Sequence, residues 1–203
     1  MYIPKSFALT DQTIISRILK EFSFGTLVSQ GKNGLQASHL PFEYDATPNT
    51  LRCHMARANP QWHDFDGETE VIAIFTGPHG YISPQWYETE LAVPTWNYVA
   101  IHAYGVPAII EDDAEVAKLL NALTARYEKN FETPWQLQAP AEWQENLRRA
   151  IVAFEIPIAR LEAKAKLSQN RPDADYTGVL SGLEANGQQE LATWMKELVE
   201  RKA

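Results

Sequence analysis

The sequence predicts an α+β fold, mainly β, in which an antiparallel sheet closes into a barrel and helices flank it. Three observations support this class. Short apolar runs divided by turn residues fill residues 25–55, which predicts an antiparallel three-strand meander. An aromatic and β-branched segment at 95–110 is bent at Gly105 and Pro107, which allows the sheet to close. Helical spacing occurs at both ends of the chain.

Length and charge limit the alternatives. The chain has 203 residues, enough for one substantial core, so we expect a single domain over 1–203 with C-terminal helices. The net charge of -8 opposes attraction to phosphate backbones, which makes direct DNA binding doubtful. Cys53 is the only cysteine and suits a reducing cytosol. Without a membrane-length apolar run or a signal-peptide core, we expect a cytoplasmic protein with no membrane partner.

The first half of the chain predicts one helix followed by strands. Thr10 or Asp11 caps a helix that stops before Gly25. One face of this helix carries Ile14, Ile15, Ile18, Leu19 and Phe22. The unbroken apolar run at 71–75 predicts a strand in the middle of the sheet. We expect residues 77–80 to turn the chain before a short strand at 81–83.

The second half returns to helical spacing. Helices are predicted at 111–127 and 141–149, and the strand at 151–156 is expected to continue through 160–166. Two C-terminal helices follow, with Asn186 and Gly187 at the start of the last one. The buried face of this last helix is predicted to hold Leu191, Trp194, Met195, Leu198 and Val199.

Generic motifs exclude several kinds of site. The two common glycine-rich phosphate loops are absent, and so are the nucleophile elbow and the zinc-protease pair. The histidines lack metal-site spacing, so no metal is predicted. Trp135, Trp143 and Trp194 lie in helical patterns and are interpreted as core or interface packing.

A first candidate segment, residues 54–62, joins the end of a strand to a short helix. Asn59 is suited to cap this helix and Pro60 to its first position. Arg57 can give a bidentate pair to a phosphate. The alternative is that Asn59 is only a cap and Arg57 only a surface charge.

Three further candidates lie beside turns. A flat ligand can be surrounded by Ser83, Trp96, Asn97 and Tyr98, or these residues can belong to a barrel core with its polar tips at the rim. The segment 166–172 can reach an anion through Lys166, Gln169 and Arg171, or it can be a solvated turn. Ser38 and His39 can touch a ligand or bond only to their neighbours.

These segments resemble the signature of the PaiB-like family of FMN-binding negative transcriptional regulators, which is related to the flavin reductase and pyridoxamine-phosphate oxidase split barrels. The resemblance covers residues 1–185. The matching strings are Met1-Tyr2-Ile3-Pro4, Ser38-His39-Leu40-Pro41, His54-Met55-Ala56-Arg57-Ala58-Asn59-Pro60, Tyr81-Ile82-Ser83-Pro84-Gln85-Trp86-Tyr87, Val93-Pro94-Thr95-Trp96-Asn97-Tyr98 and Lys166-Leu167-Ser168-Gln169-Asn170-Arg171.

The resemblance implies a split β-barrel homodimer with FMN at the subunit interface. It implies that Arg57 and Asn59 hold the phosphate end, while Lys166, Gln169 and Arg171 reach in from the partner subunit or close the phosphate pocket. The residues implied to surround the flavin are Ser38, His39, Ser83, Trp96 and Asn97. No catalytic residue is implied.

Three functions stay open at this point. The first is a flavin-dependent oxidoreductase or flavin reductase that uses a nicotinamide cofactor. The second is a transcriptional regulator acting through DNA or a protein partner. Direct DNA binding would call for a basic recognition helix, yet Arg148-Arg149 is the only adjacent arginine pair, which favours an indirect route. The third is a haem-binding split barrel with His39, His54 or His102 as an axial ligand.

Overall fold

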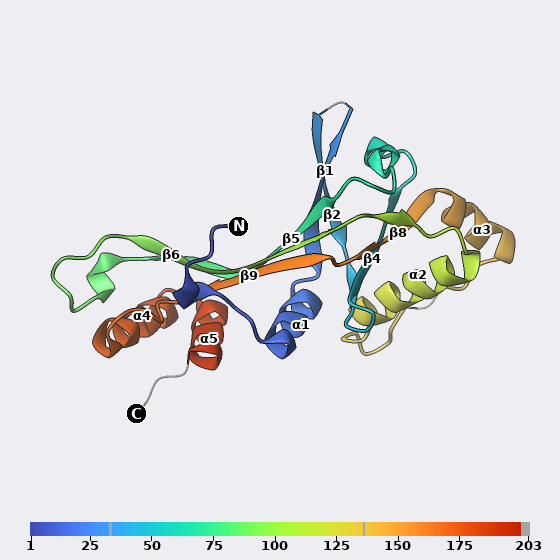
Figure 1. Cartoon of the computed structure of the whole chain (residues 1–203). Helices are drawn as coiled ribbons and strands as arrows, with labels where there is room; N and C mark the ends of the chain where they lie inside the picture. Colours follow the sequence, from blue (N-terminus) through green and yellow to red (C-terminus); the bar gives the residue numbers. More distant parts are fainter. Residues whose placement is uncertain (33, 136, 200–203) are drawn as a thin grey trace. The chain divides into compact units, whose positions relative to one another are not determined.

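The strands of the protein form two sheets (Figure 1). The computed structural model describes residues 1–32, 34–135 and 137–199. The five-stranded sheet has the order β2-β1-β5-β6-β9 and the four-stranded sheet the order β3-β4-β8-β7. The strands are β1 (Phe24–Gly31), β2 (Gly34–Pro41), β3 (Glu43–Asp45), β4 (Thr50–Ala56), β5 (Val71–Ile82), β6 (Thr95–Gly105), β7 (Ala108–Ile109), β8 (Ile151–Pro157) and β9 (Arg160–Lys166).

Helices complete the α+β architecture. The α-helices are α1 (Gln12–Glu21), α2 (Asp113–Glu128), α3 (Ala141–Arg149), α4 (Asp173–Ala185) and α5 (Gln189–Leu198), and the short 3-10 helices are η1 (Lys5–Phe7), η2 (Pro60–Asp64) and η3 (Pro84–Trp86). Asp11 caps α1 by accepting hydrogen bonds from the amides of Thr13 and Ile14. Asp112 caps α2 in the same way. Among the described residues, none of the helices has both the length and the apolar character to cross a membrane.

The chain divides into two compact units. Unit 1 comprises Met1–Ile15, Thr76–Ile101 and the residues from Glu162 onward, and unit 2 comprises Ser16–Phe75 and His102–Leu161. Strands β5, β6 and β9 each contribute residues to both units. The single domain over 1–203 stays a prediction.

The predicted three-strand meander is wrong, because its third strand belongs to the other sheet. Strands β1 and β2 pair with each other over their full length, whereas β4 pairs with β3 and β8. The chain leaves the first sheet at Phe42, whose side chain is fully buried and whose amide donates to the carbonyl of Ser23. The buried ring thus marks the point where the chain passes from β2 of the first sheet to β3 of the second.

The central strand is confirmed, but the turn predicted at 77–80 is wrong. Strand β5 lies between β1 and β6 and continues to Ile82. Gly80 does not form a turn. Its lack of a side chain allows close packing inside unit 1. A Cβ at Gly80 would lie 2.0 Å from Oε1 of Gln188 and 2.9 Å from a methyl of Leu191.

Two predicted long strands are divided between the sheets. The bend expected at Gly105 is confirmed, since β6 ends there and β7 lies in the four-stranded sheet. Continuation of the strand from 151–156 into 160–166 is wrong, because β8 and β9 lie in different sheets. Between them, the amides of Ile158 and Ala159 donate to the carbonyls of Asn49 and Tyr104. These bonds satisfy the backbone where neither sheet does.

Unit 2 has a core of aromatic and aliphatic side chains. The rings of Phe42 and Phe75 meet edge to face with centroids 5.3 Å apart. Helix α2 packs Val116, Leu119 and Leu123 around Ala153 of β8, as its 3.6-residue spacing predicts. Both helices predicted between 111 and 149 are therefore confirmed.

The C-terminal helices of unit 1 are also confirmed. Leu191, Trp194 and Met195 of α5 are buried, as their spacing predicts. Asn186 and Gly187 end α4, however, and do not start α5. Asn186 is the C-cap of α4, and Gly187 follows with a φ of 74°.

Gly178→Ala is expected to destabilise the protein by about 1–3 kcal/mol, which is the usual range for overpacking. A Cβ at position 178 would lie 1.9 Å from the backbone oxygen of Trp86, and a backbone atom cannot move aside as a flexible side chain can. The gain in helix propensity from glycine to alanine, about 1 kcal/mol, is smaller than the upper part of this range. Thermal unfolding of Gly178→Ala and of the exposed control Ser181→Ala checks this. Equal melting temperatures would contradict it.

Candidate functional site

Ser38 and Asn59 meet inside unit 2. Asn59 Nδ2 donates to Ser38 Oγ at 2.8 Å, and Asn59 Oδ1 accepts from the amide of Gln61 at 3.0 Å. Asn59 therefore caps η2, with Pro60 at its start, as the sequence predicts. The bond to Ser38 ties the cap to the middle of β2. Both polar side chains have protein partners, and together they fix the loop that carries Arg57.

His39 lies on the other face of the same strand, because successive side chains of a strand point to opposite faces. Its Nδ1 lies 2.9 Å from Thr26 Oγ1. The ring of Phe24 stacks on the imidazole with centroids 6.3 Å apart. Phe24 is 67% exposed, so this pair forms a flat surface open to solvent.

Apolar residues surround this pair on three neighbouring strands of unit 2. Val28 pairs with both Ala37 and Ile72, and Thr26 pairs with both His39 and Ile74, so all six share one face. We call this the open sheet face, and it consists of Phe24, Thr26, Val28, Leu35, Ala37, His39, Ile72 and Ile74. Leu35 is 74% exposed there. The opposite face holds fully buried core residues such as Leu27 and Ala73.

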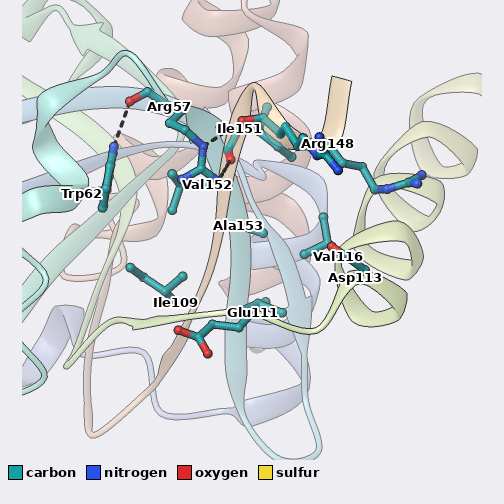
Figure 2. A pocket seen from close by; sticks show the side chains of 12 residues that line it. Arg57, Trp62, Ile109, Glu111, Asp113, Val116, Arg148, Ile151, Val152 and Ala153 are labelled. Carbon is teal, nitrogen blue, oxygen red and sulfur yellow. Dashed lines mark hydrogen bonds between the residues drawn. The ribbon is translucent and has the colours of Figure 1, made fainter. Parts of the chain in front are cut away.

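Arg57 follows β4 and lines a cavity of about 400 Å³ in unit 2 (Figure 2). Its Nε donates to the carbonyl of Arg149 and its Nη2 to the carbonyl of Ile151, both at 2.7 Å. Trp62 Nε1 donates to the carbonyl of Arg57, and the guanidinium lies 5.9 Å from the Trp62 ring. The side chain is thus held in place while it remains exposed. Two bonds use two of its five N–H groups, and an anion can accept from others.

The cavity carries charges of both signs. Arg148 and Arg149 line it together with Arg57, and so do Glu111 and Asp113 (Figure 2). The two neighbouring arginines both pair with Glu145, at 2.7 and 3.0 Å. Arg57 donates only to carbonyls in its hydrogen bonds described above, so its charge is the best suited of the three to an added anion.

The other predicted residues lie in unit 1, where Asn97 is fully buried. Its Nδ2 donates to Ser168 Oγ at 2.9 Å, and its Oδ1 accepts from the same hydroxyl at 3.2 Å. Ser168 has a φ of 61°, in the left-handed region. Asn97 therefore holds the turn that carries Gln169 and Arg171. Ser83 has a local role as the cap of η3, where it accepts from the amide of Gln85.

Lys166 and Trp96 come together in unit 1. Lys166 Nζ donates to the carbonyl of Trp96 at 2.8 Å and to Thr95 Oγ1. Desolvation lowers the pKa of Lys166, and the positive charges of Lys164 and Arg171 lower it further. Added negative charge near these cations would relieve the repulsion. Trp96 is 53% exposed and packs against His79 and Tyr81.

Gln169 and Arg171 differ in how they are held. Gln169 is bound to the backbone at both ends of its amide, by the amide of Leu167 and the carbonyl of Ala165. Arg171 lies over the ring of Tyr87 at 4.4 Å, and its Nη1 is 4.0 Å from Asp175 Oδ2. Arg171 is thus the member of this turn that presents a cation.

The sequence interpretation missed three residues that the structure adds to these groups. Phe24 forms the flat surface with His39, Trp62 supports Arg57, and Tyr87 supports Arg171. Trp62 ends the candidate segment 54–62 and Tyr87 ends a quoted string, so their proximity in sequence was a usable signal. Phe24 gave none, because its place beside His39 depends on the pairing of β1 with β2.

Comparison with known sequences decides the family. Residues 1–160 match the sequence model of the family described as "Putative FMN-binding domain". The chain belongs to this family. It is 39% identical over its full length to protease synthase and sporulation protein PAI 2 of Bacillus subtilis, of which it covers 98%. The resemblance to the PaiB-like family is therefore confirmed, and membership assigns FMN to this chain as its cofactor.

Solved structures confirm the fold. The flavocytochrome Anf3 of Azotobacter vinelandii superposes with a TM-score of 0.65 at 14% identity, over 87% of this chain and 78% of that one. The FAD and heme binding protein of Mycobacterium smegmatis gives a TM-score of 0.60 at 16% identity, over 78% of this chain and 72% of that one. The α+β split-barrel fold expected for the FMN-binding family is confirmed.

The residues present fit FMN by their chemistry. FMN joins a flat, largely apolar ring to a charged phosphate, so a site needs exposed flat surface and fixed cations. Unit 2 has a flat exposed surface at Phe24 and His39 and a fixed cation at Arg57. Unit 1 provides the exposed Trp96 and the cations Lys166 and Arg171. Each unit by itself therefore has an exposed aromatic surface and at least one cation.

Proposed function

We propose that the chain is a flavin-dependent redox protein that binds FMN as a homodimer, with the open sheet face as the dimer interface. The observation that carries this proposal is the open sheet face itself. Monomeric proteins rarely leave a contiguous apolar sheet face uncovered. A second copy related by a twofold axis would cover Leu35 and Phe24 with the same sheet face of its own chain.

His39 connects this interface to the cofactor. Its ring lies on the open sheet face, stacked with Phe24, and it is polar within an apolar surface. A flavin ring placed there would contact the apolar side chains of the face, and the imidazole of His39 would offer a hydrogen bond to the edge of the ring. Ser38 points to the opposite face, where its partner is Asn59. We propose that Ser38 acts by holding Asn59 and the loop of Arg57.

The phosphate is proposed to bind Arg57, and Asn59 positions the loop. Lys166, Gln169 and Arg171 would reach in from the partner subunit or close the phosphate pocket. Within this set, Lys166 and Arg171 are the better candidates for binding the phosphate. Both are cations, and a bound anion would relieve the repulsion between them. Asn97 is proposed to position their turn, since its side chain is fully buried and bonded to Ser168. Ser83 and Trp96 complete the surroundings of the flavin.

Bound FMN supplies the electron-transfer chemistry, and a nicotinamide cofactor is the proposed electron donor. The protein's own part is to bind and orient the flavin and to cover it from water by dimerisation. Any role in regulating transcription is proposed to be indirect, without binding of the chain to DNA. Arg148 and Arg149 form the adjacent arginine pair, and both are already bound to Glu145. A gel-shift assay at physiological salt that gave a specific DNA complex would overturn this part of the proposal.

An FMN titration of the purified chain tests the proposed function. Saturable binding of one FMN per subunit is expected, with quenched flavin fluorescence, because the ring would leave water for an aromatic and apolar surface. Sedimentation velocity in the same buffer should show a dimer. Absence of binding at high FMN concentration would overturn the proposal. A Soret band in the spectrum of the purified protein would favour the haem-binding alternative instead.

A further inference from the structure

A groove of about 530 Å³ lies between α2 and α3 in unit 2. Helix α2 contributes Asn121 and Glu128, helix α3 contributes Trp143 and Leu147, and the connecting segment contributes Trp135. A volume of this size falls within the range of small-molecule sites. None of the residues proposed to contact FMN lines it.

The two tryptophans have no role in the core. Trp135 is 56% exposed and Trp143 is 49% exposed, although both occur in helical sequence patterns that predict packing. Both indole side chains line the same groove. Leu137 and Leu147, 39% and 44% exposed, line it as well. The groove is therefore an apolar and aromatic site that the described part of unit 2 leaves half open to solvent.

The charge of the groove selects the kind of ligand. Of the residues that line it, Glu128 is the one with a charged side chain. Its Oε2 accepts from the backbone amide of Trp135 at 2.7 Å, so the carboxylate is fixed at the backbone of a residue whose side chain lines the same groove. Aromatic faces and a nearby carboxylate both attract cations, and organic cations are bound in proteins by this combination. An anion would meet the carboxylate without a compensating positive charge from the lining residues.

We propose that this groove binds small organic cations with an apolar body, such as aromatic ammonium compounds, at a site separate from the flavin. The proposal does not depend on FMN binding, since FMN carries the opposite charge and its proposed residues lie elsewhere. A polar edge of the ligand would be met by Asn121, Thr124 and Gln144, whose side chains also line the groove.

Titration of the full chain with benzyltrimethylammonium, followed by tryptophan fluorescence and isothermal calorimetry, tests this proposal. Benzyl alcohol and benzenesulfonate are the neutral and anionic aromatic comparisons. Saturable binding of the cation is expected, about tenfold tighter than that of either comparison, which lies between the effect of an exposed and that of a desolvated cation–π contact. Equal binding of the cation and the alcohol would overturn the charge argument, and no saturable binding of the cation would overturn the site.

Two variants locate the site. Glu128→Gln keeps an oxygen that can accept from the Trp135 amide and removes the charge, so binding of the cation should weaken about tenfold while helical content is retained. Glu132→Gln, an exposed residue that does not line the groove, is the matched control and should leave binding unchanged. Trp143→Ala should abolish the calorimetric signal. Unchanged affinity in both Glu128→Gln and Trp143→Ala would overturn the proposal, as would dissociation of a dimer in Trp143→Ala, which would make the groove an interface between copies.

Discussion

Arg57→Ala is expected to weaken FMN binding by about 10- to 100-fold, the effect of losing one or two hydrogen bonds to a charged group. The guanidinium is held by the carbonyls of Arg149 and Ile151 and is supported by Trp62, so little entropy is lost when it binds a phosphate. Fluorescence titration of FMN against the variant and the wild type measures the change. The effect should fall as salt rises, because the interaction is electrostatic.

Two controls separate a lost contact from a lost fold. Arg17→Ala removes an exposed arginine of α1 whose partner is Glu21, and it should leave FMN affinity unchanged. Arg57→Lys retains the charge without the planar fork, so an intermediate affinity is expected. Thermal unfolding of all three variants reports any general damage. Wild-type affinity in a folded Arg57→Ala variant would remove Arg57 from the site and leave the cations of unit 1 as the phosphate ligands.

Ala37→Arg is expected to prevent dimerisation, raising the dissociation constant of the dimer by at least about 100-fold, because an unpaired charge would be buried among apolar side chains. Ala37 is opposite Val28 in the middle of the open sheet face and is exposed in the single chain. The variant should therefore fold as a monomer. If the flavin site is completed by the partner subunit, FMN affinity should fall together with the dimer. Sedimentation velocity and FMN titration measure the two effects.

Ala114→Arg is the matched control, since Ala114 is also exposed and lies in unit 2, in the first turn of α2. A stable dimer and normal FMN binding are expected for it. A dimer of Ala37→Arg with wild-type affinity would show that the open sheet face is not the interface. Loss of the dimer with unchanged FMN affinity would show instead that each subunit binds the cofactor alone.

Local structure followed closely from sequence. The helices at 12–21, 113–128 and 141–149 were predictable from apolar spacing and capping residues, because a helix closes its hydrogen bonds within itself. The Asn59 cap and the bend at Gly105 were equally local. The turn at 77–80 failed for the opposite reason. Glycine there serves a contact with Gln188, more than a hundred residues away, and no local pattern reports such a contact.

The candidate site shows the same division. The rare strings around Arg57, Trp96 and Lys166 identified the family and the cofactor, and both are confirmed by comparison with known sequences. Their individual roles could not be predicted. Asn97 and Trp96 are adjacent in sequence, yet the first is fully buried and the second is 53% exposed, because neighbouring side chains of β6 point to opposite faces.

The sequence by itself therefore determined the class of fold, most helices, the family and FMN, since these depend on short-range periodicity and on strings of rare residues. Only the tertiary structure decided which strands share a sheet, because pairing joins residues distant in the chain. It also decided that Ser38 and His39 face opposite ways and that Arg57 is held by Arg149 and Ile151. The open sheet face is the clearest case, since it exists only because β1 pairs with β2 on one side and with β5 on the other.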